Sequence, residues 1–361
     1  MTMTAARELR LIYIAPRTGV SGVGDYADDF IEGVRPHLGE VRQLRHGGPG
    51  TESILDVMRA RRELRAIIAE RPAMPTVVHA EQSGGAITAF WAPAGLRGVA
   101  VTATVHDPPL AVWWPFRTRG LARSRVLSHG IHRSLFGLMN RIEARVNGSR
   151  TLFTLTELGG QRLAANMPNS HIVSTVHVVP ERPELRPLAE RPLAVGLYGY
   201  VYRGKGFDAL AELRAALDPD ILIRVAGRGT QRLAPVDGVE ILGEVNGPDE
   251  DAFFDSIRLL VVPYAGRAQY GVEVTVASGT VSRALAYQTP VLATDSGAMR
   301  ELPGGVVLVD GGPAELAARA NELVRDDAAL SALQSGSRAL RERDSRERVG
   351  RTFLATWEAL T

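Results

Sequence analysis

The sequence contains no cysteine among its 361 residues, which excludes disulfide bonds, thiolate metal sites and a cysteine nucleophile. It also contains no window of about 18 apolar residues, so we expect no membrane-spanning helix. The first ten residues lack the apolar stretch of a signal peptide, so we expect a cytoplasmic protein.

Lysine is almost absent from the chain. Lys205 is the one lysine among 42 lysine and arginine residues, and arginine has replaced lysine everywhere else. A lysine that persists against this bias indicates a position that needs a compact ammonium rather than a planar guanidinium, although chance retention is the alternative. Lys205 is therefore a candidate functional residue.

Charge is unevenly distributed. The net charge is only +2, yet residues 117–150 hold eight arginines and one acid, directly after the aromatic stretch WWPF at 113–116. Arginines beside exposed aromatics favour contact with a membrane surface or an anionic acceptor. A solvated helical face with core aromatics is the alternative. No nucleic-acid-binding module is visible, so we expect no nucleic-acid partner.

Short apolar runs of strand length alternate with stretches of helical periodicity, and the pattern restarts after the proline- and charge-rich segment 180–192. This alternation predicts two parallel sheets, each covered by helices on both faces. We predict an α/β chain of two tandem Rossmann-like doubly wound domains facing across a cleft: residues 1–182 and 183–344, with the C-terminal helix 345–361 joining the first. The predicted strands cover 9–15, 40–46, 76–81, 99–107, 149–156, 171–179, 192–201, 221–227, 239–245, 258–264, 289–295 and 305–312. The predicted helices cover 25–38, 54–70, 136–148, 207–217, 249–257, 280–288, 313–326 and 345–360.

Gly22 and Gly24 lie in a loop between the first predicted strand and helix. With Ala27 they fit the dinucleotide fingerprint G-x-G-x-x-A, although the loop is longer than the fingerprint's tight turn. Glycines let a ligand approach the backbone, and a helix amino terminus favours an anion. A flexible loop without a ligand is the alternative.

His106 and Asp107 end a buried strand. The carboxyl ends of strands carry the ligand site in open parallel sheets, so His106 is a candidate for binding a ligand hydroxyl or relaying a proton. A structural histidine is the alternative.

Lys205 follows the first strand of the second predicted domain and is flanked by Gly204 and Gly206. An ammonium beside glycines at a helix start suits phosphate oxygens. The segment is not a P-loop, because G-x-x-x-x-G-K-[ST] is absent.

Ser278, Gly279, Thr280 and Val281 stand at the start of another predicted helix, where small hydroxyl residues and a glycine form an anion seat. An ordinary helix cap is the alternative reading of the same residues. Glu273 before this turn and Glu301 after the next strand are candidates for binding sugar hydroxyls.

Taken in order, these motifs resemble the group 1 family of GT-B glycosyltransferases. The similar segments are the loop with Gly22 and Gly24, ATVHD (103–107), GYVYRGKG (199–206), IRVAGRG (223–229), ILGEV (241–245), LLVVPY (259–264) and TPVLATDSGAMREL (289–302).

The resemblance implies a retaining transfer of a sugar from a nucleotide-sugar co-substrate, without a bound metal or other cofactor. It places His106, Lys205 and Glu273 in catalysis and implies a saccharide or lipid-linked acceptor. The cytoplasmic face of a membrane is then the place of action if residues 113–150 bind lipid. The donor-binding residues that it implies, together with the anion seat, are Gly22, Gly24, Lys205, Gly227, Gly243, Ser278, Gly279, Thr280, Val281 and Glu301.

Three positions depart from the family's pattern. Tyr200 stands where the family often has an arginine, and Thr275 and Arg283 stand where it has two glutamates. These departures keep two alternatives open: a catalytically inactive GT-B-like binding or scaffold protein, and a dinucleotide-dependent oxidoreductase that uses Gly22 and Gly24.

Overall fold

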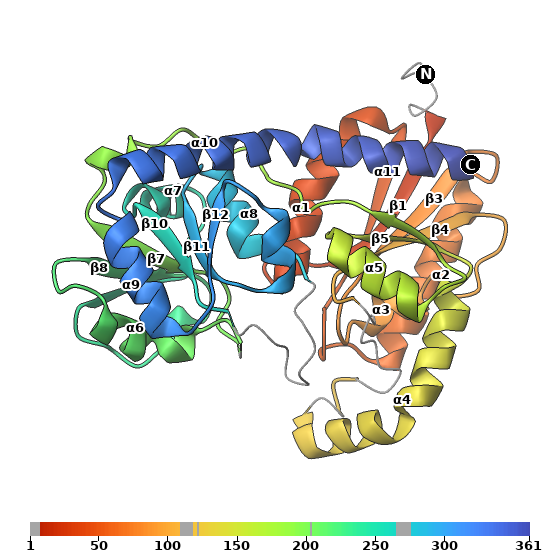
Figure 1. Cartoon of the computed structure of the whole chain (residues 1–361). Coiled ribbons are helices and arrows are strands. Elements are labelled where there is room, and N and C mark those ends of the chain that lie inside the picture. Colours follow the sequence, from red (N-terminus) through yellow and green to blue (C-terminus); the bar gives the residue numbers. More distant parts are fainter. Residues whose placement is uncertain (1–7, 109–117, 121–122, 203, 265–275) are drawn as a thin grey trace. The chain divides into compact units, whose positions relative to one another are not determined.

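The structure is a computed structural model that describes residues 8–108, 118–120, 123–202, 204–264 and 276–361. The chain divides into two compact units (Figure 1). The N-terminal unit comprises Met1–Val178, Thr275–Ala277 and Arg346–Thr361, and the C-terminal unit comprises Val179–Val274 and Ser278–Ser345. Among the described helices, none combines the length and the apolar composition that crossing a bilayer requires.

The N-terminal unit is built on a parallel six-stranded sheet, as predicted. Its strand order is β2-β1-β3-β4-β5-β6, and every neighbouring pair is parallel. The carboxyl ends of all six strands therefore share one edge of the sheet. The strands are β1 (Arg10–Pro16), β2 (Glu40–His46), β3 (Thr76–Gln82), β4 (Ala100–Val105), β5 (Thr151–Thr154) and β6 (His171–Ser174).

Alternating residues of these strands supply two separate apolar cores. In β1, Leu11 and Tyr13 face one core, whereas Ile12 and Ile14 face the other, as the period of two in a strand requires. Helices α1 and α11 cover the first face, and α2 to α5 cover the second. The helices are α1 (Gly22–Val34), α2 (Ile54–Glu70), α3 (Ile87–Trp91), α4 (Arg125–Asn147), α5 (Glu157–Asn166) and α11 (Arg346–Leu360), with the 3-10 turn η2 (Arg35–His37).

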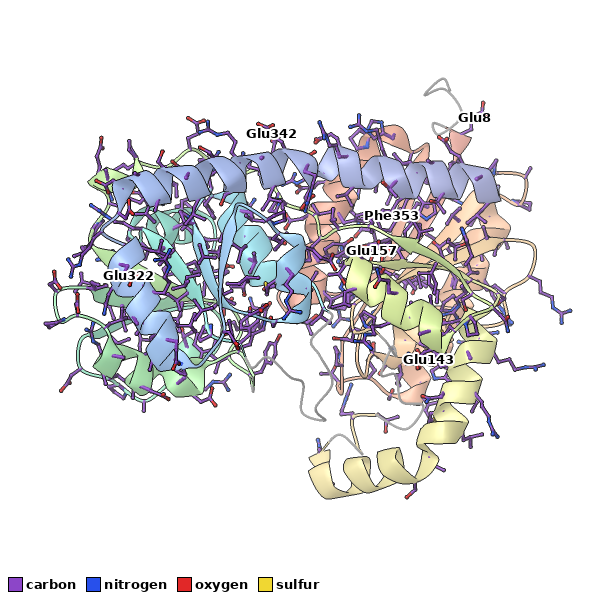
Figure 2. All side chains as sticks on the ribbon, in the orientation of Figure 1. Glu8, Glu143, Glu157, Glu322, Glu342 and Phe353 are labelled. Atoms are coloured by element: carbon purple, nitrogen blue, oxygen red, sulfur yellow. The ribbon has the colours of Figure 1, made fainter. Side chains whose placement is uncertain are left out.

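The C-terminal helix α11 packs against α1 and fills the N-terminal unit with aromatic side chains (Figure 2). Phe353 is fully buried, and its ring stacks on Phe153 of β5 at a centroid distance of 4.0 Å. Trp357 is also fully buried, and its Nε1 donates to Oγ1 of Thr102 at 3.1 Å. The last helix of the chain is therefore part of the N-terminal core.

The C-terminal unit contains a second parallel sheet of order β12-β11-β10-β7-β8-β9. The chain runs outward from β7 to β9 and then returns to the other side of β7 at β10, so the strand order reverses between β7 and β10. Ligands of doubly wound sheets bind outside the carboxyl ends of the strands at such a reversal. The strands are β7 (Ala194–Tyr198), β8 (Leu222–Ala226), β9 (Val239–Gly243), β10 (Leu259–Val262), β11 (Val291–Thr294) and β12 (Val306–Val309).

Helices again cover both faces of this sheet. One apolar core joins the sheet to α7 and α8, and the other joins it to α6 and α9, while α10 contributes to both. The predicted α/β class with two Rossmann-like units is confirmed. The helices are α6 (Leu210–Ala216), α7 (Pro248–Asp255), α8 (Gly279–Ala286), α9 (Pro313–Leu323) and α10 (Asp327–Arg343), and the 3-10 turns are η4 (Leu188–Glu190), η5 (Phe207–Ala209), η6 (Thr230–Arg232) and η7 (Gly297–Glu301).

Candidate functional site

The carboxyl edge of the C-terminal sheet brings Lys205 and the start of α8 together through one tyrosine. Nζ of Lys205 donates to Oη of Tyr264 at 2.6 Å, and the same Oη lies 3.1 Å from Oγ of Ser278. Lys205 follows β7 and Tyr264 follows β10, so the bond spans the reversal of strand order. The structure thus connects two residues that the sequence singled out, through a third that it did not.

Two glycines allow the backbone to pack tightly at this edge. A Cβ on Gly227 would lie 2.1 Å from the carbonyl oxygen of Gly199, and Gly227 has a φ of +127° that side chains disfavour. A Cβ on Gly206 would lie 2.2 Å from the carbonyl oxygen of Pro263. The loops after β7, β8 and β10 are therefore in direct contact beside Lys205.

The amino terminus of α8 offers backbone donors. Ser278 caps the helix by accepting the N–H of Val281 at 3.3 Å, and the hydroxyl of Thr280 donates to the carbonyl of Tyr198 at 3.2 Å. The Val281 N–H and the Thr280 hydroxyl are thus engaged within the unit. The N–H groups of Gly279 and Thr280 belong to the first turn, which has no intrahelical acceptor for them. They are the donors of this predicted turn that a ligand can use.

Lys205 keeps its charge at this edge. Burial lowers the pKa of Lys205, but the neighbouring Tyr264 and Tyr202 outweigh that effect and raise the pKa above its ordinary value. The ammonium lies 3.9 Å from the ring centroid of Tyr264 and 5.3 Å from that of Tyr202, within range for cation–π attraction. The site therefore presents a fixed positive charge at neutral pH.

A second cation lies at Tyr200, the position where the family often has an arginine. Nη1 of Arg228 donates to Oη of Tyr200 at 3.1 Å, and its guanidinium lies 5.2 Å from the centre of the ring. Arg228 also pairs with Glu244, which follows β9. Arg228 belongs to the segment IRVAGRG, but no role was predicted for it from the sequence.

Of the residues at the two missing glutamate positions, the structure describes one. Arg283 lies on α8 with its Nε 3.6 Å from Oε1 of the buried Glu250, so its charge is compensated inside the unit. Thr275 lies outside the described residues, and so does the predicted catalytic residue Glu273.

Two other residues that were predicted to bind the donor lie in described parts of the C-terminal unit. Gly243 ends β9, and its carbonyl accepts the N–H of Gly227 at 2.7 Å, so it supports the loop beside Gly199. Glu301 ends η7, where its backbone carbonyl accepts a bond from Arg343 of α10 at 3.5 Å. Within the described contacts, Glu301 is linked to α10 rather than to Lys205.

In the N-terminal unit, His106 is held by a buried carboxylate. Nε2 of His106 lies 2.6 Å from Oε2 of Glu81, whose Oε1 accepts the hydroxyl of Tyr13 at 2.6 Å and lies 3.2 Å from Nε2 of His79. Glu81 was not among the residues predicted from the sequence. The available signal was the pair His79 and Glu81, two residues apart in one strand and therefore on one face of it.

Glu81 is ionised despite complete burial. Burial would raise the pKa of Glu81, but hydrogen bonds and charge from His106 and His79 outweigh burial and hold it well below its usual range. An ionised carboxylate only accepts hydrogen bonds, so the neighbouring nitrogens that bond to it carry their protons there. The network thus fixes which nitrogen of His106 is protonated.

The loop with Gly22 and Gly24 is built differently from a dinucleotide fingerprint. Five residues separate β1 from α1, and the carboxylate of Asp25 accepts the N–H of Gly19 at 2.9 Å beside the start of the helix. A Cβ on Gly24 would lie 2.3 Å from the carbonyl oxygen of Arg17, whereas a Cβ on Gly22 would meet nothing within 4 Å. Close packing against Arg17 explains why position 24 is a glycine. The carboxylate of Asp25 lies beside the start of the helix, where a dinucleotide fingerprint would place a phosphate.

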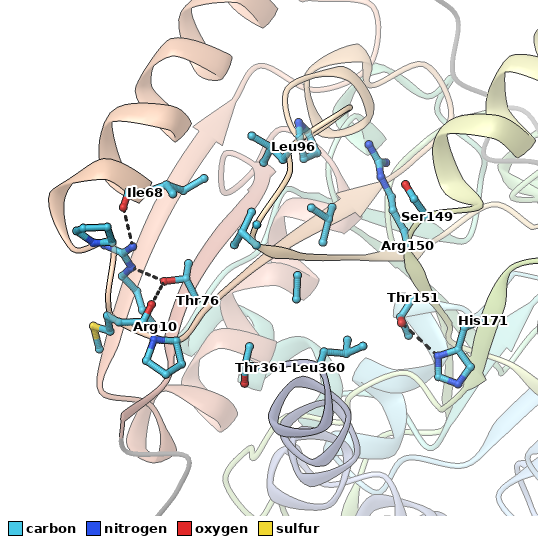
Figure 3. Close-up of a pocket in the computed structure, with 18 of the residues that line it drawn as sticks. Arg10, Ile68, Thr76, Leu96, Ser149, Arg150, Thr151, His171, Leu360 and Thr361 are labelled. Carbon is cyan, nitrogen blue, oxygen red and sulfur yellow. Dashed lines mark hydrogen bonds between the residues drawn. The ribbon is translucent and has the colours of Figure 1, made fainter.

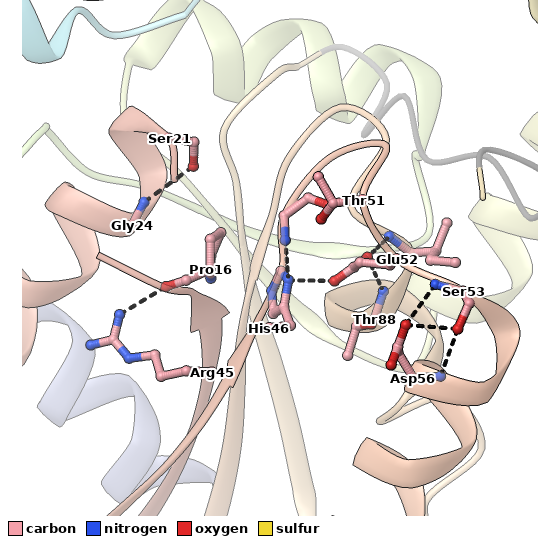
Figure 4. Close-up of polar contacts among 12 residues, drawn as sticks. Pro16, Ser21, Gly24, Arg45, His46, Thr51, Glu52, Ser53, Asp56 and Thr88 are labelled. Atoms are coloured by element: carbon pink, nitrogen blue, oxygen red, sulfur yellow. Dashed lines mark hydrogen bonds and ion pairs between the residues drawn. The ribbon is translucent and has the colours of Figure 1, made fainter. Parts of the chain in front are cut away.

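His46 and Glu52 form a second buried pair at the carboxyl end of β2 (Figure 4). Nδ1 of His46 lies 2.6 Å from Oε1 of Glu52, and Oε2 of Glu52 accepts the N–H groups of Ile87 and Thr88 at 2.8 and 3.0 Å. Burial would raise the pKa of Glu52, but these partners outweigh it and lower the pKa. Glu52 therefore links the loop after β2 to the first turn of α3 through these hydrogen bonds.

Arg150 does not belong to an exposed basic surface, contrary to the reading of residues 117–150 as one. It is only 4% exposed, and its guanidinium donates to Oδ1 of Asn147 at 3.0 Å and to the carbonyl of Phe90 at 2.9 Å. Burial lowers the pKa of Arg150 to about 9. The segment WWPF at 113–116 lies outside the described residues.

A hollow lies at the opposite edge of the N-terminal sheet, at the amino ends of its strands (Figure 3). Arg10, Thr76, Arg150, Thr151 and His171 line it together with the end of α11. Nε of Arg10 donates to Oγ1 of Thr76 at 3.1 Å, and its Nη1 donates to the carbonyl of Ile67 at 2.9 Å, so its guanidinium caps the end of α2. The hollow is therefore at the edge that doubly wound sheets do not use for ligands. No group of three His, Asp or Glu side chains placed to hold a metal ion occurs in the described part of the chain.

Comparison with known proteins agrees with this geometry. Residues 193–326 match the family model described as Glycosyl transferases group 1. No curated protein matches the sequence. Among solved structures, a glycosyltransferase from Rickettsia africae ESF-5 superposes with a TM-score of 0.66 at 13% identity and covers 98% of each chain. Anabaena Alr3699/HepE, in complex with UDP and glucose, gives a TM-score of 0.65 at 14% identity and covers 97% of this chain and all of its own.

A putative UDP-N-acetylglucosamine 2-epimerase from Listeria monocytogenes also superposes, with a TM-score of 0.58 at 11% identity over 97% of this chain and 96% of its own. At such identities the superpositions show the fold alone, and the match to the family model covers residues 193–326. That match carries Lys205, Tyr264 and the start of α8. The predicted resemblance is confirmed over residues 193–326, which match the glycosyl transferases group 1 model, and the chain as a whole shares the fold of the glycosyltransferases with which it superposes.

Proposed function

We propose that the protein transfers a glycosyl group from a nucleotide sugar, with retention of configuration, to a saccharide or lipid-linked acceptor. The C-terminal unit binds the donor in this proposal, and the N-terminal unit binds the acceptor. The observation that carries it is the bond between Lys205 and Tyr264 across the strand reversal, beside the first-turn N–H groups of α8. A nucleoside diphosphate is the ligand that such a site suits.

The chemistry follows from the leaving group. As the glycosidic bond to the diphosphate breaks, negative charge grows on the phosphate oxygens. The ammonium of Lys205 and the N–H groups of Gly279 and Thr280 stabilise that charge without reorganising, because loop and helix already hold them. Arg228 is the second cation at this edge, although Glu244 already compensates part of its charge.

UDP-glucose is the first donor to test. The Anabaena structure contains UDP and glucose, and its fold covers this whole chain. Neither the base nor the sugar follows from Lys205 and α8, which recognise phosphate. A panel of nucleotides therefore precedes any assay with an acceptor.

We also propose that part of α4 contacts anionic lipid. Its described exposed side chains include Leu138, Arg141 and Arg145, an apolar residue and two cations within two helical turns. Co-sedimentation with vesicles of anionic phospholipid at low salt tests this contact. Arg141→Glu with Arg145→Glu removes the association if it is electrostatic, and wild type that fails to sediment at low salt excludes it.

A catalytically inactive binding protein is the second candidate. The ion pair of Arg283 and Glu250, at a position where the family has a glutamate, favours it. Such a protein binds a nucleotide sugar and releases no nucleoside diphosphate.

The test has two stages. A thermal-shift screen with UDP, GDP, ADP, dTDP and their glucose derivatives identifies the ligand, because a compound that binds only the native state raises the melting temperature. The best donor is then incubated with saccharide and lipid-linked acceptors, and release of the diphosphate and the anomeric coupling of the product are measured by NMR. A retained anomer with stoichiometric diphosphate supports the proposal. Conversion of the sugar without diphosphate release indicates an epimerase, and a thermal shift without turnover indicates the binding protein.

A further inference from the structure

The Glu81 carboxylate uses both of its oxygens inside the N-terminal unit. Oε1 takes the hydroxyl of Tyr13 and lies near Nε2 of His79, while Oε2 is 2.6 Å from Nε2 of His106. Glu81 and His79 are completely buried, whereas the side chain of His106 is 9% exposed. One buried charge thus connects the interior of the unit to the carboxyl edge of its sheet.

His79 shows what a purely structural histidine looks like here. Its Nδ1 lies 2.7 Å from Oγ1 of Thr102, and its Nε2 lies 2.9 Å from Oγ1 of Thr104 as well as near Glu81. Phe153, Phe353 and Trp357 surround its ring within 5.8 Å. Both nitrogens are therefore saturated, and no ligand can reach them.

His106 differs from His79 in each of these respects. It follows the end of β4, it is partly exposed, and its one hydrogen bond through a ring nitrogen, within the described contacts, is the bond to Glu81. Its Nδ1 remains for a ligand. A side chain that is fixed on one nitrogen and open on the other suits binding a substrate hydroxyl.

We infer that Glu81 is a positioning residue: it holds the proton of His106 on Nε2 and thereby presents Nδ1 to a hydroxyl of the acceptor, which this unit binds in the proposed function. The inference rests on the proposed function for the identity of that hydroxyl, but the Nε2–H state itself is independent of it. Without the carboxylate, the imidazole ring can flip or carry its proton on Nδ1. The substrate hydroxyl then faces a protonated ring nitrogen instead of an unprotonated one. Glu81 itself touches no substrate in this account.

Other polar groups face the same cluster. Tyr26 of α1 packs edge-on against His106 at a centroid distance of 5.0 Å, and His177 packs against Tyr26 at the same distance. Burial raises the pKa of Tyr26, and burial lowers that of His177 to about 4, so both are neutral near pH 7. Tyr13 is neutral for the same reason as Tyr26, so neither tyrosine adds a charge to the cluster.

The protonation of the ring is read directly by long-range proton–nitrogen NMR of the 15N-histidine-labelled full chain at pH 7.5. The signals of His106 are assigned by their loss in His106→Gln. We expect His106 with its proton on Nε2, and we expect Glu81→Gln to shift it toward the Nδ1–H form. Wild-type protein with His106 in the Nδ1–H form overturns the inference, and this result needs neither a folded Glu81 variant nor a substrate.

The functional readout separates positioning from folding. Glu81→Gln is expected to lower kcat for diphosphate release about 10- to 100-fold through misplacement of the ring, with unchanged affinity for UDP. Glu81→Asp, which keeps the charge on a shorter stem, should recover part of the rate. Tyr13→Phe is the matched control: it removes a bond to Oε1 and leaves Oε2 with His106, so the NMR state of His106 stays unchanged. Equal losses in Glu81→Gln and Tyr13→Phe, with the same ring state in both, reduce Glu81 to a structural role.

If wild type turns over no nucleotide sugar, the proposed function fails, and the ring state of His106 still decides the inference about Glu81.

Discussion

Lys205 and Tyr264 are bonded at 2.6 Å across the point where the strand order of the C-terminal sheet reverses. The two residues are 59 positions apart in the sequence and reach each other because β7 and β10 are neighbours. Tyr264 also lies between the ammonium and the cap of α8, at 3.1 Å from Ser278. One phenol oxygen therefore connects the cation to the residue that caps the helix.

Replacing Tyr264 by Phe removes this oxygen and keeps the ring that lies 3.9 Å from the ammonium. We expect UDP affinity to fall by at most about tenfold, since a hydrogen bond to a charged group is worth about 1.5 kcal/mol and the lost bond positions the ammonium without touching UDP. Isothermal titration calorimetry measures the change. An affinity loss as large as that of Lys205→Ala would show that the ring alone does not hold the ammonium.

Replacing Phe353 by Ala opens a cavity between α11 and the N-terminal sheet, where the side chain is fully buried. We expect a loss of about 3–5 kcal/mol in the free energy of unfolding of that unit. Leu360→Ala on the same helix is the control, because Leu360 is 42% exposed, and it should change stability by less than about 0.5 kcal/mol. Similar losses in the two variants would contradict the packing of α11.

Gly22 and Gly24 provide a matched pair on α1. Gly24→Ala places a Cβ 2.3 Å from a backbone oxygen, whereas Gly22→Ala enters open space. We expect Gly24→Ala to lower the melting temperature clearly and Gly22→Ala to leave it nearly unchanged, since an overpacked site costs about 1–3 kcal/mol. If Gly22→Ala abolishes UDP binding while the fold is retained, Gly22 contacts the donor, as the sequence predicts.

His177 makes the stability of the N-terminal unit depend on pH. Burial lowers its pKa from 6.5 to about 4, so the unfolded chain takes up the proton first as the pH falls. Stability is therefore unaffected above pH 6.5, declines between pH 6.5 and about 4, and levels off below that range for this group.

His177→Asn should reduce this decline by up to about 2 kcal/mol between pH 7.5 and 5, as measured by urea unfolding. His171→Asn is the control, because His171 is exposed. Identical pH profiles for wild type and His177→Asn would show that the pKa of His177 is not lowered in the folded protein.

Local periodicity predicted most of the fold. The helix expected at 54–70 forms at those residues, and twelve parallel strands form where strand-like runs were identified. Helices α3, α5 and α10 were not predicted. The segment of α10 has few large apolar residues, with only Leu330 and Leu340 of its leucines buried, so its helical pattern is weak without the sheet beneath it.

The candidate site was only partly predictable for the same reason. Lys205 and Ser278 carried local signals, a unique lysine and a helix cap. Tyr264 carried none, because its role comes from the pairing of β7 with β10, which brings distant loops together. Glu81 was not predicted because the role of a glutamate in an apolar strand depends on the residues around it. The fold places His79 and His106 beside its carboxylate.

The affinity of UDP for wild type and for Lys205→Ala, measured by isothermal titration calorimetry at pH 7.5, tests the central claim most directly. Removing the ammonium leaves a diphosphate without a charge-assisted bond worth about 1.5–3 kcal/mol, so we predict binding about 10- to 100-fold weaker. Arg319→Ala, which removes a cation from the exposed part of α9, should bind as wild type does. Equal affinity of wild type and Lys205→Ala for UDP would contradict the assignment of Lys205 and the start of α8 as the donor site.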